Sequence, residues 1–188
     1  MSDSDAISLY SQHAAGHLRR GGILIYPTEG VYGIGCLASD EAAIQRLLQI
    51  KHRDPAKGLI LIASRIAQIR PWISHIPAAR REQILASWPG PVTWVLPAAP
   101  GISALLTGGR NTIAIRVSAQ PFVRALCDEL DAALISTSAN RSGEPPATTP
   151  AELQQTFGSE VDYIVPLMPG DLQGPTPIFD AQSGKQLR

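Results

Sequence analysis

The chain has 188 residues, 44% of them hydrophobic, and it carries 16 basic and 16 acidic residues. This length and composition suffice for one α/β domain over residues 1–188 that buries its own core without metals or disulfides. The zero net charge argues against a protein that coats nucleic acid through a basic surface, so an electropositive site must arise from local clustering.

Apolar positions at helical spacing predict a first helix that Ser4 or Asp5 caps and that ends near residues 21–22. Short apolar runs predict strands at 23–26 and 31–37, joined by the turn Pro27-Thr28-Glu29-Gly30. A second helix begins at residue 39 or 40 and runs to residue 50, before Pro55 stops it. Residues 58–63 show no polar alternation, which predicts a strand buried on both faces.

Helical patterns at 64–69 and 78–87 precede a rigid Pro-rich segment at 88–91 and a strand at 92–96. Residues 97–111 are rich in Gly, Pro, Ser and Thr and predict a mobile loop that could act as a lid. Strands at 112–117, 132–136 and 161–165 follow, with helices at 121–130 and from Thr149-Pro150 onwards, before a proline-rich tail. Because strands alternate with helices, we expect an α/β fold with a twisted mixed parallel and antiparallel sheet and flanking helices.

Two cysteines, Cys36 and Cys127, are too few and too distant for a disulfide framework or a zinc site, which predicts free thiols in a reducing compartment. The acidic N-terminus lacks the positive charge of a signal peptide, and no apolar run reaches the roughly 20 residues that span a bilayer. We therefore expect a cytoplasmic protein without membrane contact.

Three cations, Lys51, Arg53 and Lys57, lie within seven residues and directly precede the apolar run at 58–63. Such a cluster at the lip of a buried strand could neutralise several phosphates, with Arg53 as a forked donor. The alternative is a solvated helix end, where cations also suit the helix dipole. Spacing alone does not choose between the two.

The segment Ser136-Thr137-Ser138-Ala139-Asn140-Arg141-Ser142-Gly143 leaves the end of a buried strand, where open α/β sheets bind ligands. Its hydroxyls, the Asn140 amide and backbone N–H groups form a donor-rich cradle that suits phosphate or ribose. A turn stabilised by its own Ser and Asn side chains is the alternative. The position at a strand end favours a ligand site.

Thr28 follows another strand and could contact a small polar substrate, whereas its neighbour Glu29 could hold a metal or cap the turn. Arg116 lies in an apolar strand, where an unpaired guanidinium is costly, so it must meet an anion from the protein or a ligand. We favour a ligand carboxylate over a structural salt bridge, and Thr112 on the same strand face would line the same space.

Several signatures are absent from the sequence. It has no Gly-x-x-x-x-Gly-Lys-Ser/Thr phosphate loop, no dinucleotide fingerprint and no nucleophile elbow. His13 and His17 share a helix face but lack a third ligand nearby, so we predict no metal site built by the protein.

Six segments, in order and at compatible spacing, resemble the YrdC family of threonylcarbamoyl-AMP synthases, and most closely its short bacterial single-domain type. They are Tyr26-Pro27-Thr28-Glu29, the Lys51-x-Arg53 pair, Lys57-Gly58-Leu59-Ile60, Trp88-Pro89-Gly90-Pro91-Val92-Thr93, Ile113-Ala114-Ile115-Arg116-Val117 and Ser136-Thr137-Ser138-Ala139-Asn140. The resemblance covers nearly the whole chain and implies a YrdC-like sheet with a concave, electropositive face.

The resemblance implies that L-threonine, bicarbonate and ATP give L-threonylcarbamoyladenylate and pyrophosphate, the first step towards the t6A37 modification of tRNA. Catalysis would rest on positioning and charge neutralisation, with Mg²⁺ on the triphosphate and no covalent enzyme intermediate. The implied partners are these substrates and the downstream t6A transferase machinery.

The resemblance also implies the site residues. Lys51 and Arg53 are the expected catalytic pair, and the expected ATP contacts are Lys51, Arg53, Lys57, Thr112, Asn140, Thr148 and, at a weaker match, Arg188. The expected threonine contacts are Thr28, Arg116, Ser138 and Thr176, the last replacing a serine of the family. Longer members carry His where Ile62 stands, so no role is carried over there.

An RNA-binding module without catalysis is the competing hypothesis, because a basic concavity could hold the backbone of tRNA or double-stranded RNA. The zero net charge and the 5% aromatic content, which leaves few stacking platforms, argue against it. Weak RNA binding beside catalysis is compatible with the synthase hypothesis. A carbamoyl-transfer domain of the kind found in hydrogenase maturation factors is a third hypothesis, although such domains normally belong to much larger chains.

Overall fold

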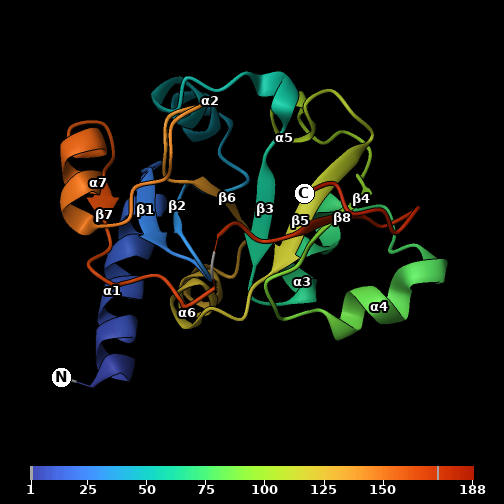
Figure 1. The fold of residues 1–188 in the computed structure, drawn as a ribbon, viewed down its shortest axis with the longest axis horizontal. Coiled ribbons are helices and arrows are strands. Elements are labelled where there is room, and N and C mark those ends of the chain that lie inside the picture. The colour runs from blue at the N-terminus through green and yellow to red at the C-terminus, as the bar shows by residue number, and fades with distance from the viewer. Residues whose placement is uncertain (1, 173) are drawn as a thin grey trace.

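The computed structural model describes residues 2–172 and 174–188. Eight strands within these residues form a sheet in the order β7-β1-β2-β6-β3-β5-β4-β8 (Figure 1). They are β1 (Leu24–Pro27), β2 (Tyr32–Gly35), β3 (Ile60–Ala63), β4 (Thr93–Pro97), β5 (Thr112–Val117), β6 (Leu134–Ser138), β7 (Tyr163–Ile164) and β8 (Ile178–Asp180). Neighbours β1 and β7, β3 and β5, and β4 and β8 run parallel, and the remaining neighbours run antiparallel. The predicted mixed sheet is confirmed.

The helices are α1 (Asp3–Leu18), α2 (Glu41–Ile50), α3 (Ile66–Ile69), α4 (Arg81–Ala86), α5 (Ala104–Thr107), α6 (Pro121–Leu130) and α7 (Pro150–Phe157), with 3-10 turns η1 (Pro55–Lys57), η2 (Arg70–Trp72) and η3 (Ala78–Arg80). The predicted start of the first helix was wrong, because Ser2 and not Ser4 or Asp5 is the N-cap. The Ser2 hydroxyl accepts from the Asp5 backbone N–H while the Asp5 carboxylate accepts from the Ser2 backbone N–H. None of the helices among the described residues is long and apolar enough to cross a membrane.

The central strands bury side chains on both faces of the sheet. In β3, Leu61 and Ala63 belong to one apolar cluster, while Ile62 belongs to the other, so the predicted two-sided burial is confirmed. The second cluster is formed largely with α1 and α6, which pack together against the sheet (Figure 1). Leu134 of β6 pairs with Ile62 and lies in this cluster, whereas Ser136, two residues further along the same face, lines an open pocket. The helices therefore cover only part of this face.

Segments near the site also differ from the sequence-based expectation. Strand β6 runs to Ser138, two residues beyond the predicted end, because Thr137 and Ser138 pair with β2. The tail contains β8, which pairs with β4 and was not predicted. The predicted mobile lid at 97–111 contains α5, and the Leu106 carbonyl accepts from the Leu59 backbone N–H. This segment therefore packs beside β3 and forms one side of the pocket described below.

Candidate active site

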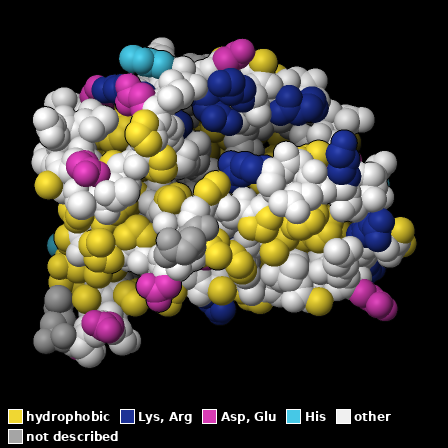
Figure 2. All heavy atoms as spheres, in the orientation of Figure 1, with side chains coloured by type: hydrophobic (Ala, Val, Ile, Leu, Met, Phe, Trp, Pro, Cys, Tyr) yellow, Lys and Arg dark blue, Asp and Glu magenta, His cyan; other side chains and the backbone are white. Residues whose placement is uncertain are grey.

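A pocket of about 660 Å³ opens on the part of the sheet that α1 and α6 leave uncovered. Residues of β2, β3, β5 and β6 line its floor, and the 28–31 turn, η1, the 106–111 segment and the tail line its walls. The described cationic residues of this lining are Arg53, Lys57, Arg110, Arg116 and Arg188, and the described acid is Asp180. Figure 2 shows Lys and Arg side chains gathered around a hollow on the upper part of the molecule. A pocket of this size and composition suits a nucleotide-sized anion.

Arg53 lines this pocket, and the protein uses only part of its hydrogen-bonding capacity. Its Nη2 donates to the Gly58 carbonyl oxygen at 3.0 Å, but its buried Nε has no hydrogen-bond partner. Partial burial lowers the pKa of the guanidinium, because water does not fully solvate the charge. Lys57 is exposed at the end of η1, and its Nζ lies 3.4 Å from the Ser142 hydroxyl. Both residues line the pocket.

Lys51 does not line the pocket as an open cation. Its side chain is 2% exposed, and its ammonium donates to the carbonyl oxygens of Ser138 and Asn140. The Lys51 carbonyl in turn accepts from the Ser142 backbone N–H at 2.9 Å. Burial, and secondarily the Arg53 charge, lower the pKa of Lys51 to about 7. Lys51 therefore ties the end of α2 to the 138–142 loop, and its influence on a ligand would act through that loop.

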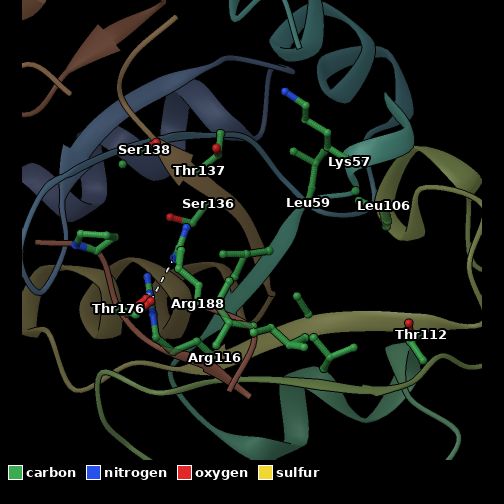
Figure 3. Close-up of a pocket in the computed structure, with 18 of the residues that line it drawn as sticks. Lys57, Leu59, Leu106, Thr112, Arg116, Ser136, Thr137, Ser138, Thr176 and Arg188 are labelled. Carbon is green, nitrogen blue, oxygen red and sulfur yellow. Dashed lines mark hydrogen bonds between the residues drawn. The ribbon is translucent and has the colours of Figure 1, made fainter. Parts of the chain in front are cut away.

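Arg116 lies at the other end of the pocket, 5% exposed, together with Thr176 and Arg188 (Figure 3). Its Nη1 donates to Thr176 Oγ1 at 2.6 Å, and its Nη2 lies 3.5 Å from Glu29 Oε2. Arg116 Nε has no partner in the described structure. Burial lowers the pKa of Arg116, and the Glu29 charge opposes that shift. The sequence favours a ligand carboxylate over a structural salt bridge. The structure contains an ion pair with Glu29 and still leaves Arg116 Nε without a protein partner.

Arg188 connects the two ends of the pocket. Its Nη2 donates to the Thr176 carbonyl oxygen at 3.0 Å, so Thr176 accepts from two guanidiniums, one on its hydroxyl and one on its backbone. Burial, followed by the charges of Arg116 and Arg53, lowers the pKa of Arg188. Like charges held this close favour a bound polyanion, because it would relieve their mutual repulsion.

The remaining hydroxyl residues lie where the sequence placed them relative to the pocket. Thr28 is buried, and its Oγ1 donates to the Val31 carbonyl at 2.7 Å, which closes the turn after β1. Ser138, at the end of β6, donates to Asn140 Oδ1, and Thr112 begins β5. All three line the pocket.

Asn140 and Thr148 lie outside this pocket. They line a neighbouring hollow of about 400 Å³ beside α7, and the Ser138 hydroxyl links Asn140 to the main pocket. The Asn140 Nδ2 donates to the carbonyls of Arg141 and Glu144, and the Thr148 hydroxyl donates to Glu152 Oε2 at 3.2 Å. The structure thus brings eight of the eleven expected residues into one pocket, places Asn140 and Thr148 in the next hollow and turns Lys51 away.

Sequence reasoning missed Arg110, which lines the pocket and holds η1 in place. Its Nη1 donates to the Ala56 carbonyl at 2.9 Å and its Nη2 to the Lys57 carbonyl at 3.0 Å. The available signal was an arginine directly after Gly108-Gly109 and before a strand, within the segment 97–111 that is predicted to be a mobile loop. The partnership of Glu29 with Arg116 and Ser118 was also missed.

The fold and this pocket define an α/β protein with a nucleotide-sized, cation-lined site on the uncovered part of a mixed sheet. A family model that covers Sua5, YciO and YrdC, described as telomere recombination, matches residues 16–188. The chain belongs to the Sua5/YciO/YrdC family.

Known relatives agree with this placement. The chain is 47% identical over 180 residues to a threonylcarbamoyl-AMP synthase of Alkalilimnicola ehrlichii, covering 94% of each chain. It is 48% identical over 177 residues to the threonylcarbamoyl-AMP synthase of Halorhodospira halophila, covering 94% of this chain and 93% of that protein.

Solved structures share the fold. The crystal structure of P. abyssi Sua5 complexed with L-threonine matches with a TM-score of 0.85 at 29% identity, over 90% of this chain and 50% of that one. This chain therefore spans about half the length of that Sua5. E. coli YciO matches with a TM-score of 0.78 at 26% identity, over 93% of this chain and 84% of that one.

Proposed function

We propose that the chain catalyses the formation of L-threonylcarbamoyladenylate and pyrophosphate from L-threonine, bicarbonate and ATP. The observation that carries this proposal is the presence, in one pocket, of Arg53 and Arg116 with uncommitted buried donors. One guanidinium suits a phosphate and the other a carboxylate, and the reaction needs both anions held in one place. The relatives named threonylcarbamoyl-AMP synthase support the substrate assignment.

The pocket geometry suggests how the substrates are arranged. Threonine would place its carboxylate against Arg116 and Thr176, while the triphosphate would extend towards Arg53 and Lys57 at the other end (Figure 3). Arg188 would lie where the two meet. Threonine carries a carbamate after its amine combines with bicarbonate, with loss of water. A carbamate oxygen then attacks the α-phosphorus, and the bond to the departing pyrophosphate breaks.

Charge neutralisation is the contribution of the protein to this step. Both reacting groups are anionic, so their approach is opposed unless fixed cations surround them. Arg53, Lys57 and Arg188 would supply that positive field, and no side chain needs to form a covalent intermediate. Mg²⁺ would enter with ATP and add to the neutralisation, held by phosphate oxygens, since Asp180 is the one described carboxylate of the lining.

Pyrophosphate release is expected only when ATP, Mg²⁺, L-threonine and bicarbonate are all present. Purified chain, an enzyme-coupled pyrophosphate assay and single omissions of each component would measure this requirement. Release of pyrophosphate at the full rate without threonine would refute the substrate assignment.

The same proposal includes three further points. The chain binds tRNA or double-stranded RNA weakly beside catalysis, it delivers the adenylate to a downstream t6A transferase, and it works in the cytoplasm. A module that only binds RNA is the less supported function, because the relatives are named as synthases. The cationic pocket is also recessed and nucleotide-sized, which suits a bound nucleotide better than the backbone of a long RNA.

Nucleotide binding is expected to take up a proton above neutral pH. With the pKa of Lys51 lowered to about 7 by burial and by Arg53, the free chain at pH 8 holds this amine mostly neutral. A triphosphate on Arg53 would offset that neighbouring positive charge, so the pKa of Lys51 should rise and up to about one proton should bind with the nucleotide.

Calorimetric titration of the chain with ATP at pH 8, in two buffers that differ in ionisation enthalpy, would measure this uptake. It should fade at pH 6, where Lys51 is already protonated. Lys51→Arg is the matched control, because arginine keeps donors and charge but does not titrate in this range. Identical heats in both buffers at pH 8 would contradict the expected coupling.

A further inference from the structure

The carboxylate of Glu29 lies behind the Arg116 guanidinium, and neither of its oxygens faces the pocket. Thr28 and Gly30 on either side line the pocket, whereas Glu29 is absent from the described lining. The Glu29 side chain is 9% exposed and that of Arg116 6% exposed. The pair is therefore shielded from water, where charge interactions are strong.

The arrangement differs from a tight structural ion pair. A guanidinium that serves only to pair with a carboxylate usually forms a fork of two hydrogen bonds at about 2.7–2.9 Å. Here Arg116 Nη2 and Glu29 Oε2 are 3.5 Å apart, and both Glu29 Oε2 and Arg116 Nε are buried without a hydrogen-bond partner. The guanidinium thus retains hydrogen-bonding capacity that its protein partners do not use.

Glu29 is itself held in place from the strand that carries Arg116. The Ser118 hydroxyl, two residues after Arg116, donates to Glu29 Oε1 at 2.5 Å. Ser118 is fully buried, and its backbone N–H donates to the Ala63 carbonyl at 2.8 Å. The Glu29 carbonyl accepts from the Leu172 backbone N–H at 3.0 Å. These contacts fix the carboxylate relative to β5.

We propose that Glu29 is a positioning residue for substrate binding, which supplies the counter-charge that lets Arg116 stay buried and orients its guanidinium towards a ligand carboxylate. A buried cation without a counter-charge carries a large desolvation penalty. Glu29 offsets that penalty from behind, at a distance that leaves Arg116 donors for the amino-acid substrate. This inference rests on the proposed function, because it assigns the ligand of Arg116 as the threonine carboxylate.

Steady-state pyrophosphate release by the full chain tests this role. Glu29→Gln is expected to raise the KM for L-threonine about tenfold or more, equivalent to about 1.4 kcal/mol, while the KM for ATP stays within about twofold. Glu29→Asp keeps the charge and should show a smaller rise. In an Arg116→Lys background, Glu29→Gln should add little further change in the threonine KM, because the effect acts through the guanidinium.

Distinct results would overturn the role. A folded Glu29→Gln chain with an unchanged threonine KM, or a rise that is equally large in the Arg116→Lys background, would show that Glu29 does not act through Arg116. If Glu29→Gln does not fold, Ser118→Ala decides, since it removes the hydrogen bond to Oε1 but keeps both charges. It should raise the threonine KM about threefold with the ATP KM unchanged, and no change would contradict the inference. Absence of threonine-dependent release by the wild-type chain would instead overturn the proposed function and the inference with it.

Discussion

Arg53→Ala is expected to lower the rate of pyrophosphate release by about 100- to 1,000-fold, the usual cost of removing one strong transition-state donor. Arg53 spends one nitrogen on the Gly58 carbonyl and keeps a buried Nε without a partner, so its remaining donors are available to a phosphate. The loss should appear mainly in kcat/KM for ATP. Circular dichroism and thermal unfolding should stay close to wild type, because the side chain is only half-buried.

Arg20→Ala provides a charge-matched control for this variant. Arg20 is exposed beyond the end of α1 and does not belong to the described pocket lining. The control should therefore retain wild-type turnover. If Arg53→Ala itself keeps wild-type turnover, the triphosphate does not bind at the Arg53 end of the pocket.

Gly35→Ala is expected to destabilise the fold by about 3 kcal/mol or more, since overpacking against backbone cannot be relieved by a rotamer change. A Cβ on Gly35 would overlap the Ile135 carbonyl oxygen, which already accepts from the Tyr26 hydroxyl at 3.1 Å. Strand β2 would have to move away from β6, which carries Ser136 and Ser138 into the pocket. Chemical denaturation would measure the loss of stability, and the threonine KM would report the displaced strand.

Gly16→Ala is the matched control for this glycine. Gly16 lies within α1, and the atom nearest to its added Cβ would be Arg20 Nη1 at an ordinary 3.7 Å. Alanine there should stabilise the chain by about 0.5–1 kcal/mol, because it restricts the unfolded chain and favours helix. A Gly35→Ala variant as stable as Gly16→Ala would show that the two strands can separate at little cost.

Local patterns predicted the elements that carry strong local signals. Helix α6 begins at Pro121 and ends at Leu130 as expected, because a proline at the first helical position and a regular apolar face define it. Strand β3 was recognisable from its unbroken apolar run. Strand β8 was missed because Ile178–Asp180 is too short to show a pattern, and its pairing with β4 is a tertiary event.

Individual residues of the site could be predicted from the sequence, but the contacts between them could not. Residues at strand ends, such as Thr28 and Ser138, could be proposed from the position of hydroxyls after apolar runs. The inward turn of Lys51 could not, because its carbonyl partners lie 87 and 89 residues away in sequence. The pairing of Glu29 with Arg116 likewise joins the turn after β1 to β5, which no local spacing relates.

The strand order has a consequence for synthesis of the chain. Strand β6 lies between β2 and β3, although both precede it in sequence. During translation β2 lacks its β6 partner, and β3 lacks both β5 and β6, so the centre of the sheet cannot close before residues 134–138 are made. The nascent chain therefore exposes both of these strand edges until residues 134–138 have been made, and a pocket that includes Ser136 and Ser138 cannot form before that strand is inserted.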